Sequence, residues 1–371
     1  MMLFFLLLLI GFTVWITQRI IERFGFRNLT YTLAFSAEEV SEGDTVELIE
    51  TIISRKPIPL PWVKAELTTQ SALQFASAQS AVSEETRFVS SCFCLFPYKK
   101  IERRWHVTCT RRGLYTVSHV VLVISDLFGM SEHSKPMPDI TARLTVLPAV
   151  RNLDEITDLP QNFGGEILRR RTVIPDRFAV CGIREYADGD SVRDICWTAS
   201  ARSENPMVWQ FQETASPELT VLLNLETRLT DRERLSDRSL FEDTVRVCAG
   251  LLGTAVQMHI PVRLLSNTEI EGIPVESRAA GGQPALLHLL RILAALPDTI
   301  SCRFTRMLRR CLADNQNSAV IILTPFVSEE LFQIAASDAR ITVLSLKAPD
   351  FPVIPVNIRQ ITLRQERKIA S

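Results

Sequence analysis

The sequence predicts an α+β multidomain protein with an N-terminal transmembrane helix, a β-sandwich-like domain and a doubly wound α/β domain. Three observations predict this order. The first 17 residues carry no charge, apolar residues tend to alternate from Leu29 to about Ile124, and apolar strands alternate with longer helical segments after Glu218. The chain of 371 residues is also long enough for about two domains.

Residues 1–21 are the expected membrane anchor. The first 17 residues are an uncharged run, and with Gln18, Arg19, Ile20 and Ile21 they approach the roughly 20 residues that span a bilayer. A cleaved signal peptide would show a basic start and a small-residue cleavage site, and the run has neither. A buried core helix is the alternative. Arg19, Arg23 and Arg27 follow the run and no basic residue precedes it, which predicts a single-pass cell-membrane protein with its soluble domains in the cytoplasm. Eight scattered cysteines fit that reducing compartment.

Residues 28–150 are predicted to form the β-sandwich-like domain. Turn-forming residues separate short segments in which apolar residues tend to alternate. The expected strands are 29–36, 44–53, 61–69, 87–95, 102–110 and 114–124, and the segment 131–140, with its two prolines, is expected to be a connection.

Residues 218–371 are predicted to form the doubly wound α/β domain. Its expected strands are mostly apolar, as strands covered on both faces should be, and they are Leu219–Leu225, Pro261–Leu265, Ala319–Leu323 and Ile341–Leu346. Apolar residues recur at helical spacing between them, first around Phe241–Leu252 and then around Leu286–Leu293. We interpret both helical faces as core.

Residues 151–217 join the two domains and contain a dense charged stretch, Arg177–Glu213. Seven arginines meet seven acids between Gly164 and Glu204, a balance that favours guanidinium groups held by carboxylates over a phosphate-binding groove. Ala187, Asp188 and Gly189 are expected to form a turn. Ser191 and Asp194 have the spacing of a capping box that begins a short helix.

This segment is expected to act as a structural knot with one exposed edge. Arg193, Trp197 and Ala201 fall four residues apart and would share one face of a continuous helix. The more conservative interpretation is that the charged residues simply lock the segment onto the α/β domain, since paired charges usually serve geometry.

The same residues resemble the hallmark of the domain-of-unknown-function 58 family, which runs Arg-Glu-Tyr, Gly-Asp, Arg, Trp and Ala-Arg. The matching positions, which are also the candidates for motif and partner binding, are Arg184, Glu185, Tyr186, Gly189, Asp190, Arg193, Trp197, Ala201 and Arg202. Upstream, Arg111–Tyr115 resembles the family's Arg-Arg-Gly-x-Tyr strand, and Asp126–Gly129 resembles its Asp-Pro-Phe-Gly segment with Leu127 in place of proline.

The resemblance implies a membrane anchor, a β-domain, the motif segment and a von Willebrand factor type A-like α/β domain. It also implies two partners, a MoxR-type AAA+ ATPase and a transglutaminase-like membrane protein. Members of the family usually begin with a hairpin of two membrane helices, whereas this sequence shows a single span.

A metal-binding type A domain places Asp-x-Ser-x-Ser after its first strand, because a hard cation prefers carboxylate and hydroxyl oxygens. Here that run is Asn224-Leu225-Glu226-Thr227-Arg228, and Thr324-Pro325 stands where another acid is often found. We therefore expect no metal site. The sequence also lacks a Gly-rich phosphate loop, a His-Glu-x-x-His motif and a Gly-x-Ser-x-Gly elbow, so we expect no cofactor.

Two hypotheses of function follow. The favoured one is a non-catalytic, bilayer-anchored protein-interaction module that acts with the ATPase in assembly or maturation of other proteins. The alternative is a hydrolase or transferase that uses the acidic cluster around Asp188 and Asp190, with Glu185 beside Arg184 and Arg193. A net charge of −1 provides no field to attract nucleic acid.

Overall fold

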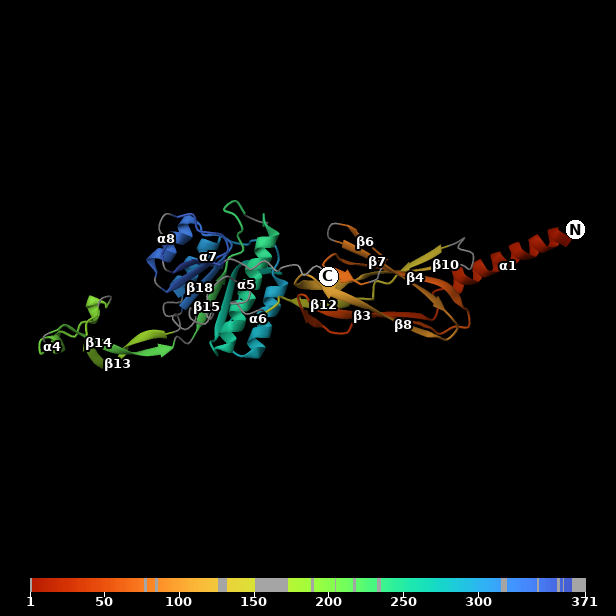
Figure 1. Cartoon of the computed structure of the whole chain (residues 1–371). Helices are drawn as coiled ribbons and strands as arrows, with labels where there is room; N and C mark the ends of the chain where they lie inside the picture. The colour runs from red at the N-terminus through yellow and green to blue at the C-terminus, as the bar shows by residue number, and fades with distance from the viewer. Residues whose placement is uncertain are drawn as a thin grey trace, which may run out of the picture. The chain divides into compact units, whose positions relative to one another are not determined.

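The protein is a mixed α+β molecule, as predicted (Figure 1). The computed structural model describes residues 2–76, 79–83, 86–125, 132–150, 173–187, 190–203, 205–215, 218–231, 235–314, 319–338, 340–351, 354–355 and 357–361. The chain divides into two compact units, one of residues 1–149 with 293–295 and the other of residues 150–292 with 296–371. The segment Asp126–Gly129 lies outside the described residues.

The first unit begins with helix α1 (Met2–Phe24). Ile21 is buried in the core of this unit, and the amide of Gly25 donates to the carbonyl of Ile21 at 2.7 Å. A side chain at Gly25 would collide with that same carbonyl, so glycine permits the chain to turn closely against the helix end. Among the residues that the structure describes, no helix is both long enough and apolar enough to cross a membrane.

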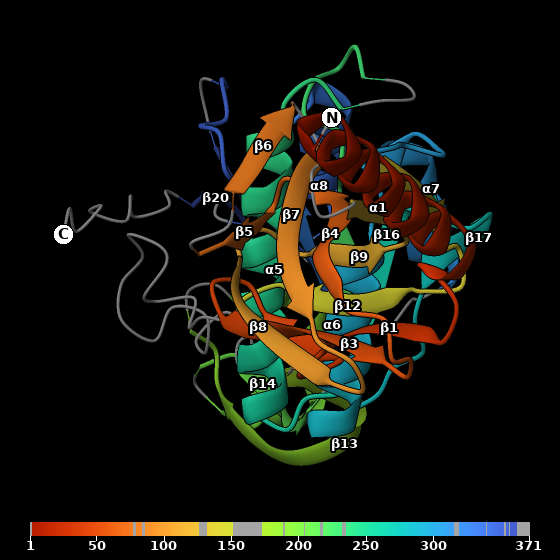
Figure 2. The same ribbon diagram turned by 90° about the vertical axis from the view of Figure 1, so that its right-hand side faces the viewer.

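Three sheets form the rest of this unit. The first contains β1 (Leu29–Phe35), β3 (Thr45–Ser54), β8 (Lys100–Cys109) and β5 (Leu73–Phe75) in that order. The second contains β11 (Glu132–Pro136), β10 (His119–Ser125), β4 (Leu60–Gln70), β7 (Thr86–Leu95) and β6 (Gln79–Ser83). The third contains β2 (Glu39–Ser41), β12 (Ala142–Leu147) and β9 (Gly113–Val117). Figure 2 shows β3 and β8 on one side of this unit and β4 and β7 on the other, and one apolar core includes residues from all three sheets.

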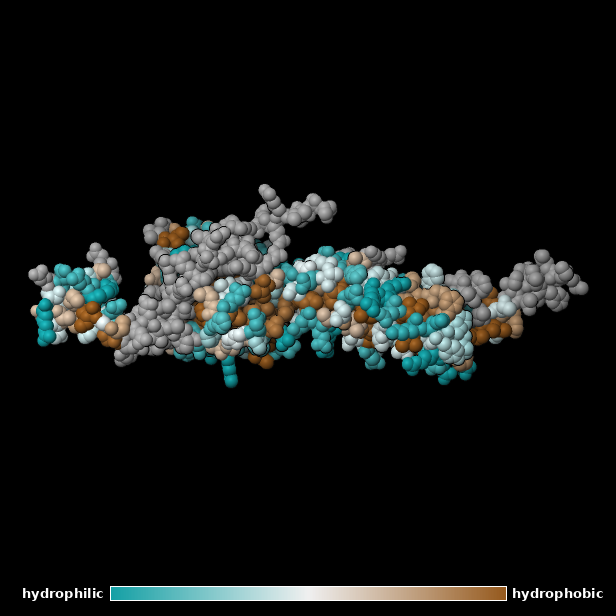
Figure 3. Space-filling model, turned by 60° about the horizontal axis from the view of Figure 1, so that its bottom comes forward, coloured by the Kyte–Doolittle hydropathy of each residue, from teal (hydrophilic) through white to brown (hydrophobic). Residues whose placement is uncertain are grey.

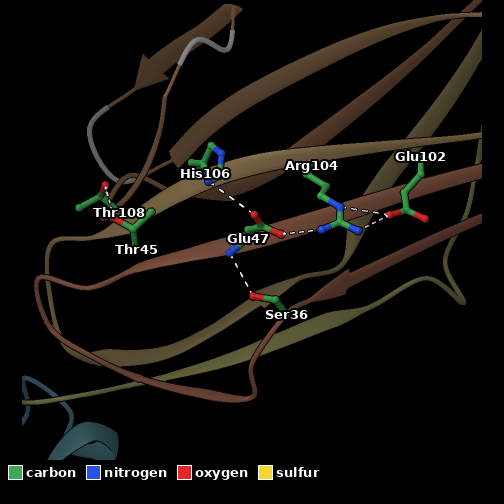
Figure 4. A network of polar contacts seen from close by, with 7 residues as sticks. All are labelled: Ser36, Thr45, Glu47, Glu102, Arg104, His106 and Thr108. Atoms are coloured by element: carbon green, nitrogen blue, oxygen red, sulfur yellow. Dashed lines mark hydrogen bonds and ion pairs between the residues drawn. The ribbon is translucent and has the colours of Figure 1, made fainter.

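Strand β3 shows why these segments form a sandwich. Its even-numbered residues are buried and its odd-numbered residues are partly or fully exposed, as the period of two requires. On the exposed face, Arg104 lies between Glu102 and Glu47, at 3.0 and 3.4 Å, and His106 approaches Glu47 (Figure 4). On the buried face, Glu50 interrupts the apolar residues.

Glu50 is fully buried and accepts three hydrogen bonds. Its carboxylate receives the hydroxyl of Tyr31 (2.7 Å), the hydroxyl of Ser91 (2.9 Å) and the indole N–H of Trp105 (2.7 Å). Tyr31 and Trp105 belong to the same sheet as Glu50, whereas Ser91 lies on β7 in the second sheet. The carboxylate therefore joins the two sheets inside the core.

The Arg-Arg-Gly-x-Tyr segment forms a turn that enters β9. Gly113 has φ +153°. A Cβ atom added at Gly113 would lie 3.3 Å from the ring of Tyr115. The hydroxyl of Tyr115 donates to the carbonyl of Arg111 at 2.6 Å. The glycine and the tyrosine of this segment thus have a local structural role, because the ring needs the space that the missing side chain leaves.

Five predicted strands of this unit correspond to β1, β3, β4, β7 and β8. The sixth prediction, 114–124, is wrong as a single strand, because the chain breaks at Ser118 into β9 and β10, which belong to different sheets. The predicted connection 131–140 contains β11, which pairs with β10 up to Pro136. Proline is tolerated there because β11 is an edge strand.

The second unit contains a six-stranded sheet. Its strand order is β17 (Ile273–Glu276), β16 (Val262–Ile270), β15 (Leu219–Leu223), β18 (Ala319–Thr324), β19 (Ile341–Ser345) and β20 (Ile358–Gln360). All neighbours are parallel except β17, which runs antiparallel at the edge. The first strand of this sheet in the sequence, β15, therefore lies inside it. The next two strands, β16 and β17, are on one side of β15, and β18, β19 and β20 are on the other.

Helices cover both faces of this sheet, as Figure 1 shows. Helices α5 (Arg238–Gln257) and α6 (Gln283–Ala295) lie on one face, and α7 (Phe304–Asp314) and α8 (Glu329–Ser337) on the other. Phe304 and Leu331 pack with Leu222 and Ile322 in the core of the second face. The predicted doubly wound arrangement is therefore observed.

Strands β13 (Val173–Glu185) and β14 (Met207–Ala215) pair antiparallel as a separate two-stranded ribbon. Between them lie a short 3₁₀-helix, η1 (Val192–Asp194), and a single helical turn, α4 (Trp197–Ser200). We call these two strands together with the segment that connects them the ribbon, and it contains the residues that the sequence marked as a motif.

Candidate functional site

The end of the ribbon is held by a clamp between Arg184 and Asp190. Both guanidinium Nη atoms donate to the two carboxylate oxygens at 2.7 Å, which is the bidentate geometry expected for a strong charge-assisted pair. The amide of Ala187 donates to the same carboxylate at 2.9 Å, and the hydroxyl of Tyr186 donates to the carbonyl of Asp190 at 3.2 Å. One aspartate therefore closes the turn and fixes the arginine.

The clamp also determines the protonation state of Asp190. The hydrogen bonds from Arg184, helped by the amide of Ala187, lower the pKa of Asp190 from 3.8 to about 2. Asp190 is consequently ionised at neutral pH and holds no proton to donate. A carboxylate this acidic is also a weak base, so the geometry favours positioning over general acid–base chemistry.

A second feature of the site is the break between η1 and α4. Ser191 precedes η1, and its side chain accepts from the amide of Arg193 at 3.3 Å. In the expected capping box it would accept from the amide of Asp194, which instead donates to the backbone carbonyl of Ser191 at 2.9 Å. The chain then becomes extended at Ile195, with φ −67° and ψ 124°. Ile195 forms a β-bridge with Val208, so pairing with β14 interrupts the helix.

This break corrects the predicted helical face. Arg193 lies in η1, Trp197 begins α4 and Ala201 follows it, so the three residues do not occupy one continuous helix. Ser200 instead ties the turn to β14, because its hydroxyl donates to the carbonyl of Cys196 at 2.9 Å and accepts from the amide of Met207 at 2.8 Å.

Several large apolar side chains of the ribbon are exposed. Trp197 is 70% exposed and Val192 is 65% exposed, while Ile183 and Trp209, which are paired across the two strands, are about 40% exposed. We call these four residues the apolar patch. Figure 3 shows apolar colour on the ribbon next to hydrophilic residues. A partner that covers these side chains would remove apolar surface from water, which is favourable.

The predicted site residues thus separate into two groups. Arg184, Glu185, Tyr186 and Asp190 come together at the clamp, where the carbonyl of Glu185 accepts from Arg184 at 3.0 Å. Arg193, Trp197, Ala201 and Arg202 are exposed on the η1–α4 segment. Gly189 and Asp188 lie outside the described residues. Sequence reasoning missed Val192, although an apolar residue directly after the capping Ser191 was a usable signal.

A second polar cluster lies where β15 and β18 end. This edge is the point at which the strand order reverses, and such switch points are the usual ligand sites of doubly wound sheets. The side chain of Asn224 donates to the hydroxyl of Thr324 at 3.0 Å, and its oxygen accepts from the amide of Glu226 at 3.0 Å. The amide of Asn267 donates to that same oxygen at 3.3 Å. The sequence did not predict Asn267, which comes from β16.

Asp231 organises the loop that follows β15. Its carboxylate accepts from the amide and hydroxyl of Thr227, at 2.9 and 2.5 Å, and from the hydroxyl of Ser236. Burial alone would raise the pKa of Asp231, but the hydrogen bonds from Ser236 and Thr227 outweigh that effect and lower it. The loop therefore contains an ionised carboxylate whose oxygens already serve protein donors.

These residues do not fit a divalent cation. One carboxylate oxygen of Glu226 accepts from the amide of Phe304 at 2.9 Å. Burial raises the pKa of Glu226, so this carboxyl gives up its proton less readily than an ordinary one, and a metal ligand must be deprotonated. The side-chain oxygen of Asn224 is engaged by two donors. Among the residues that the structure describes, no group of three or more His, Cys, Asp or Glu side chains is placed to hold a metal.

Part of the second unit matches a known protein family. Residues 182–351 match the model of the family described as protein of unknown function DUF58, which confirms the family expected from the motif. The match begins inside the ribbon and covers most of the six-stranded sheet. A comparison with curated proteins found no match.

Three solved structures that resemble this chain each cover about a third of it. A cohesin module from the family 33 glycoside hydrolase of Clostridium perfringens ATCC13124 has a TM-score of 0.24 and 11% identity, over 33% of this chain and 97% of that one. A non-cellulosomal cohesin from Archaeoglobus fulgidus has a TM-score of 0.23 and 11% identity, over 32% and 91%. The CARDB domain of the PF1109 protein from Pyrococcus furiosus has a TM-score of 0.22 and 14% identity, over 33% and 96%. Likenesses this low provide no argument about function.

Proposed function

Because residues 182–351 match the DUF58 family model, we propose that this chain is a membrane-anchored protein-interaction module that acts with a MoxR-type AAA+ ATPase in assembly or maturation of other proteins. The observation that carries the proposal is the apolar patch beside the Arg184–Asp190 clamp. The clamp supplies rigidity, and the patch supplies apolar surface that gains free energy when a partner covers it.

The ribbon has the properties of an element that is completed by a partner. A two-stranded ribbon alone buries little apolar surface and is at best marginally stable in water. Here Trp197 and Trp209 add large aromatic side chains, which are enriched among residues that dominate binding energy. The ATPase as partner, and the transglutaminase-like membrane protein as a further component, rest on the family resemblance.

The α/β domain serves in this proposal as a von Willebrand factor type A-like scaffold that lacks a metal site. Support comes from the strand order, with its antiparallel edge strand β17, and from the hydrogen bonds that occupy Asn224 and Asp231. Binding by this protein would then depend on the ribbon and its arginines rather than on a bridging metal ion.

The anchor is residues 1–21, with the soluble domains in the cytoplasm. Support comes from the sequence, where 18 uncharged residues precede Arg19, and Arg23 and Arg27 follow. Ile21 and Gly25 connect this helix closely to the β-domain, so the span would be joined to a folded unit without a flexible linker.

The proposal is tested by recovering the ATPase with variants of the full chain. Trp197→Ser and Val192→Ser should reduce recovery of the ATPase by about fivefold or more each, because losing a large apolar contact at an interface centre typically costs over about 1 kcal/mol. Ile273→Ser is the matched control, because Ile273 is also 70% exposed but lies on β17.

The variants must fold as stably as the unaltered chain for this comparison to be valid. We expect that they do, because Trp197 and Val192 are exposed and substitutions of exposed side chains change stability little. Equal recovery of the ATPase with all three variants would reject the patch as the partner surface. Turnover of a substrate that disappears only with Asp190→Asn would instead support the hydrolase or transferase alternative.

A further inference from the structure

The end of the β-domain from which α1 emerges has the composition of a surface that lies against lipid headgroups. Three loops meet there, residues 25–28 after α1, 55–59 between β3 and β4, and 96–99 between β7 and β8. The amide of Arg55 donates to the carbonyl of Asn28 at 2.9 Å, and the amide of Ser54 donates to the carbonyl of Lys99 at 3.0 Å. The three loops therefore form one continuous surface.

Charge in these loops has one sign. They contain Arg27, Arg55, Lys56 and Lys99 and no acidic residue, although the whole chain carries slightly more acids than bases. Arg27, Arg55 and Lys99 are exposed. Lys100 at the start of β8 is also exposed, but it pairs with Glu102 at 3.3 Å. A group of basic side chains next to a membrane helix is the composition that anionic lipids attract.

Aromatic side chains are exposed among these bases. Phe96 is 63% exposed and Tyr98 is 68% exposed. Tyr98 has φ +56°, a conformation that a bulky residue rarely adopts, so the turn holds an aromatic side chain outward at some conformational cost. Tyrosine at the boundary between membrane and water places its ring among the headgroups and its hydroxyl in water.

Lys56 fixes this surface relative to the helix. Unlike its neighbours it is buried, and its ammonium donates to the carbonyls of Phe24, at 3.1 Å, and Gly25 at the C-terminal end of α1. A cation at this end also matches the negative pole of the helix dipole. The loops consequently keep a set distance from the helix.

That distance matches the headgroup layer. Gly25 follows Arg19, the first charged residue of α1, by six positions, which is about 9 Å along a helix. The polar layer on each side of the hydrocarbon core is about 5 to 8 Å thick. Long Lys, Arg and Tyr side chains of the loops would therefore reach the phosphates of a bilayer that α1 crosses.

We propose that the loops 25–28, 55–59 and 96–99 bind the anionic headgroups of the membrane and hold the β-domain against its surface. This inference rests on the proposed anchor, and it adds a second, electrostatic contact with lipid. The bound chemistry is a layer of phosphodiester anions, as in phosphatidylglycerol.

Photo-crosslinking of the full chain in vesicles tests the contact. The photoreactive amino acid p-benzoylphenylalanine is placed at Tyr98 or, as control, at Phe88, which is also exposed but lies ten residues earlier, near the start of β7. The seven residue steps from Phe88 to Leu95, at the other end of β7, rise about 23 Å. We expect lipid adducts at position 98 and not at position 88. The adducts at position 98 should increase when phosphatidylglycerol is included in phosphatidylcholine vesicles.

Charge-reversal variants show whether the bases are responsible. Arg55→Glu and Lys99→Glu should each lower the adduct yield at position 98 by about fivefold or more, because each base near an anionic surface contributes about that factor. Arg143→Glu, an exposed arginine on β12, is the matched control and should leave the yield unchanged. Equal yields at positions 98 and 88, or no response to either reversal, would overturn the proposal.

Extraction of the vesicles with alkaline carbonate examines the anchor separately. An intact anchor keeps every variant in the membrane pellet, including those that lose the lipid adduct. If carbonate releases the protein while the adduct at position 98 still depends on phosphatidylglycerol, the anchor is rejected and the headgroup surface stands. If the protein remains in the pellet without the adduct, the anchor stands and the headgroup surface is rejected.

Discussion

Glu50 is the residue on which the β-domain depends most directly. It is fully buried, yet three neutral donors from β1, β7 and β8 satisfy its carboxylate. The guanidinium of Arg103 lies over the rings of Phe93, at 4.5 Å, and Trp105, at 5.5 Å, close to this cluster. A buried charge of this kind costs free energy to desolvate and is retained only when its partners are complete.

Replacing Glu50 with leucine should therefore destabilise the β-domain by about 3 kcal/mol or more. The buried hydroxyls of Tyr31 and Ser91 and the half-buried indole N–H of Trp105 lose their acceptor, and a buried donor left unsatisfied costs about 1 to 3 kcal/mol. Hydrogen exchange of the β3 and β8 amides in the full chain measures the change. Glu47→Leu on the exposed face of the same strand is the control, with an expected loss below about 1 kcal/mol. Similar losses in the two variants would contradict a special role for Glu50.

Tyr31 makes the same cluster sensitive to high pH. Burial, together with the adjacent Glu50 carboxylate, raises the pKa of Tyr31 well above its usual value of 10. The stabilising contribution of the protonated tyrosine is fully present below pH 10. Above pH 10 the unfolded chain releases this proton while the folded chain keeps it, so stability falls by about 1.4 kcal/mol per pH unit.

This pH dependence is measured as the free energy of opening of β1 between pH 9 and 11. Tyr31→Phe should remove the part of the slope that begins at pH 10, and Tyr98→Phe should leave it, because Tyr98 is exposed. An unchanged slope in the Tyr31→Phe variant would assign the effect to other groups.

At the scale of whole elements, the sequence predicts those strands whose residues alternate or are continuously apolar. The residues of β3 alternate and those of β18 are almost all apolar, so both strands could be predicted. The strands β11, β17 and β20 lie at sheet edges and are short or polar, so no local pattern distinguishes them from loops. Their pairing is determined by neighbours distant in the sequence.

The candidate site was predictable to the same extent. Arg184 and Asp190 are six residues apart, and the turn between them was visible from the sequence. The pairing of Ile195 with Val208 joins residues on either side of α4, and helical spacing could not reveal it. Asn267 was missed for the same reason, because it lies on β16, 43 residues from Asn224 in the sequence. Asp231 is only four residues from Thr227, but no motif marked the turn between them.

The loop after β15 leads to a prediction about metal binding. The oxygens of Asn224 and Asp231 already accept hydrogen bonds from the protein, and Arg228 adds a positive charge. We therefore expect calorimetry with Mg²⁺ or Mn²⁺ to detect no site tighter than about 1 mM, the weak end of oxygen-ligand sites.

A matched pair of variants makes this measurement informative. Asn224→Asp combined with Arg228→Ser supplies a carboxylate and a hydroxyl and should increase affinity for Mg²⁺, which demonstrates that the assay can detect a site at this edge. Submillimolar binding by the unaltered chain that disappears with Asn224→Ala would show that the degenerate site still holds metal.

At the scale of the whole molecule, the proposed orientation places both units on the side of the membrane that carries Arg19, Arg23 and Arg27. Protease added to intact cells should then leave the β-domain and the α/β domain uncut, whereas protease added after permeabilisation should degrade them. The free thiols offer a second readout, because Cys92 and Cys94 are exposed and should react with a membrane-impermeant maleimide only after permeabilisation. A cytoplasmic marker protein controls for leakage. Cleavage or labelling in intact cells while that marker survives would reverse the orientation and move the ribbon to the side where no cytoplasmic ATPase can reach it.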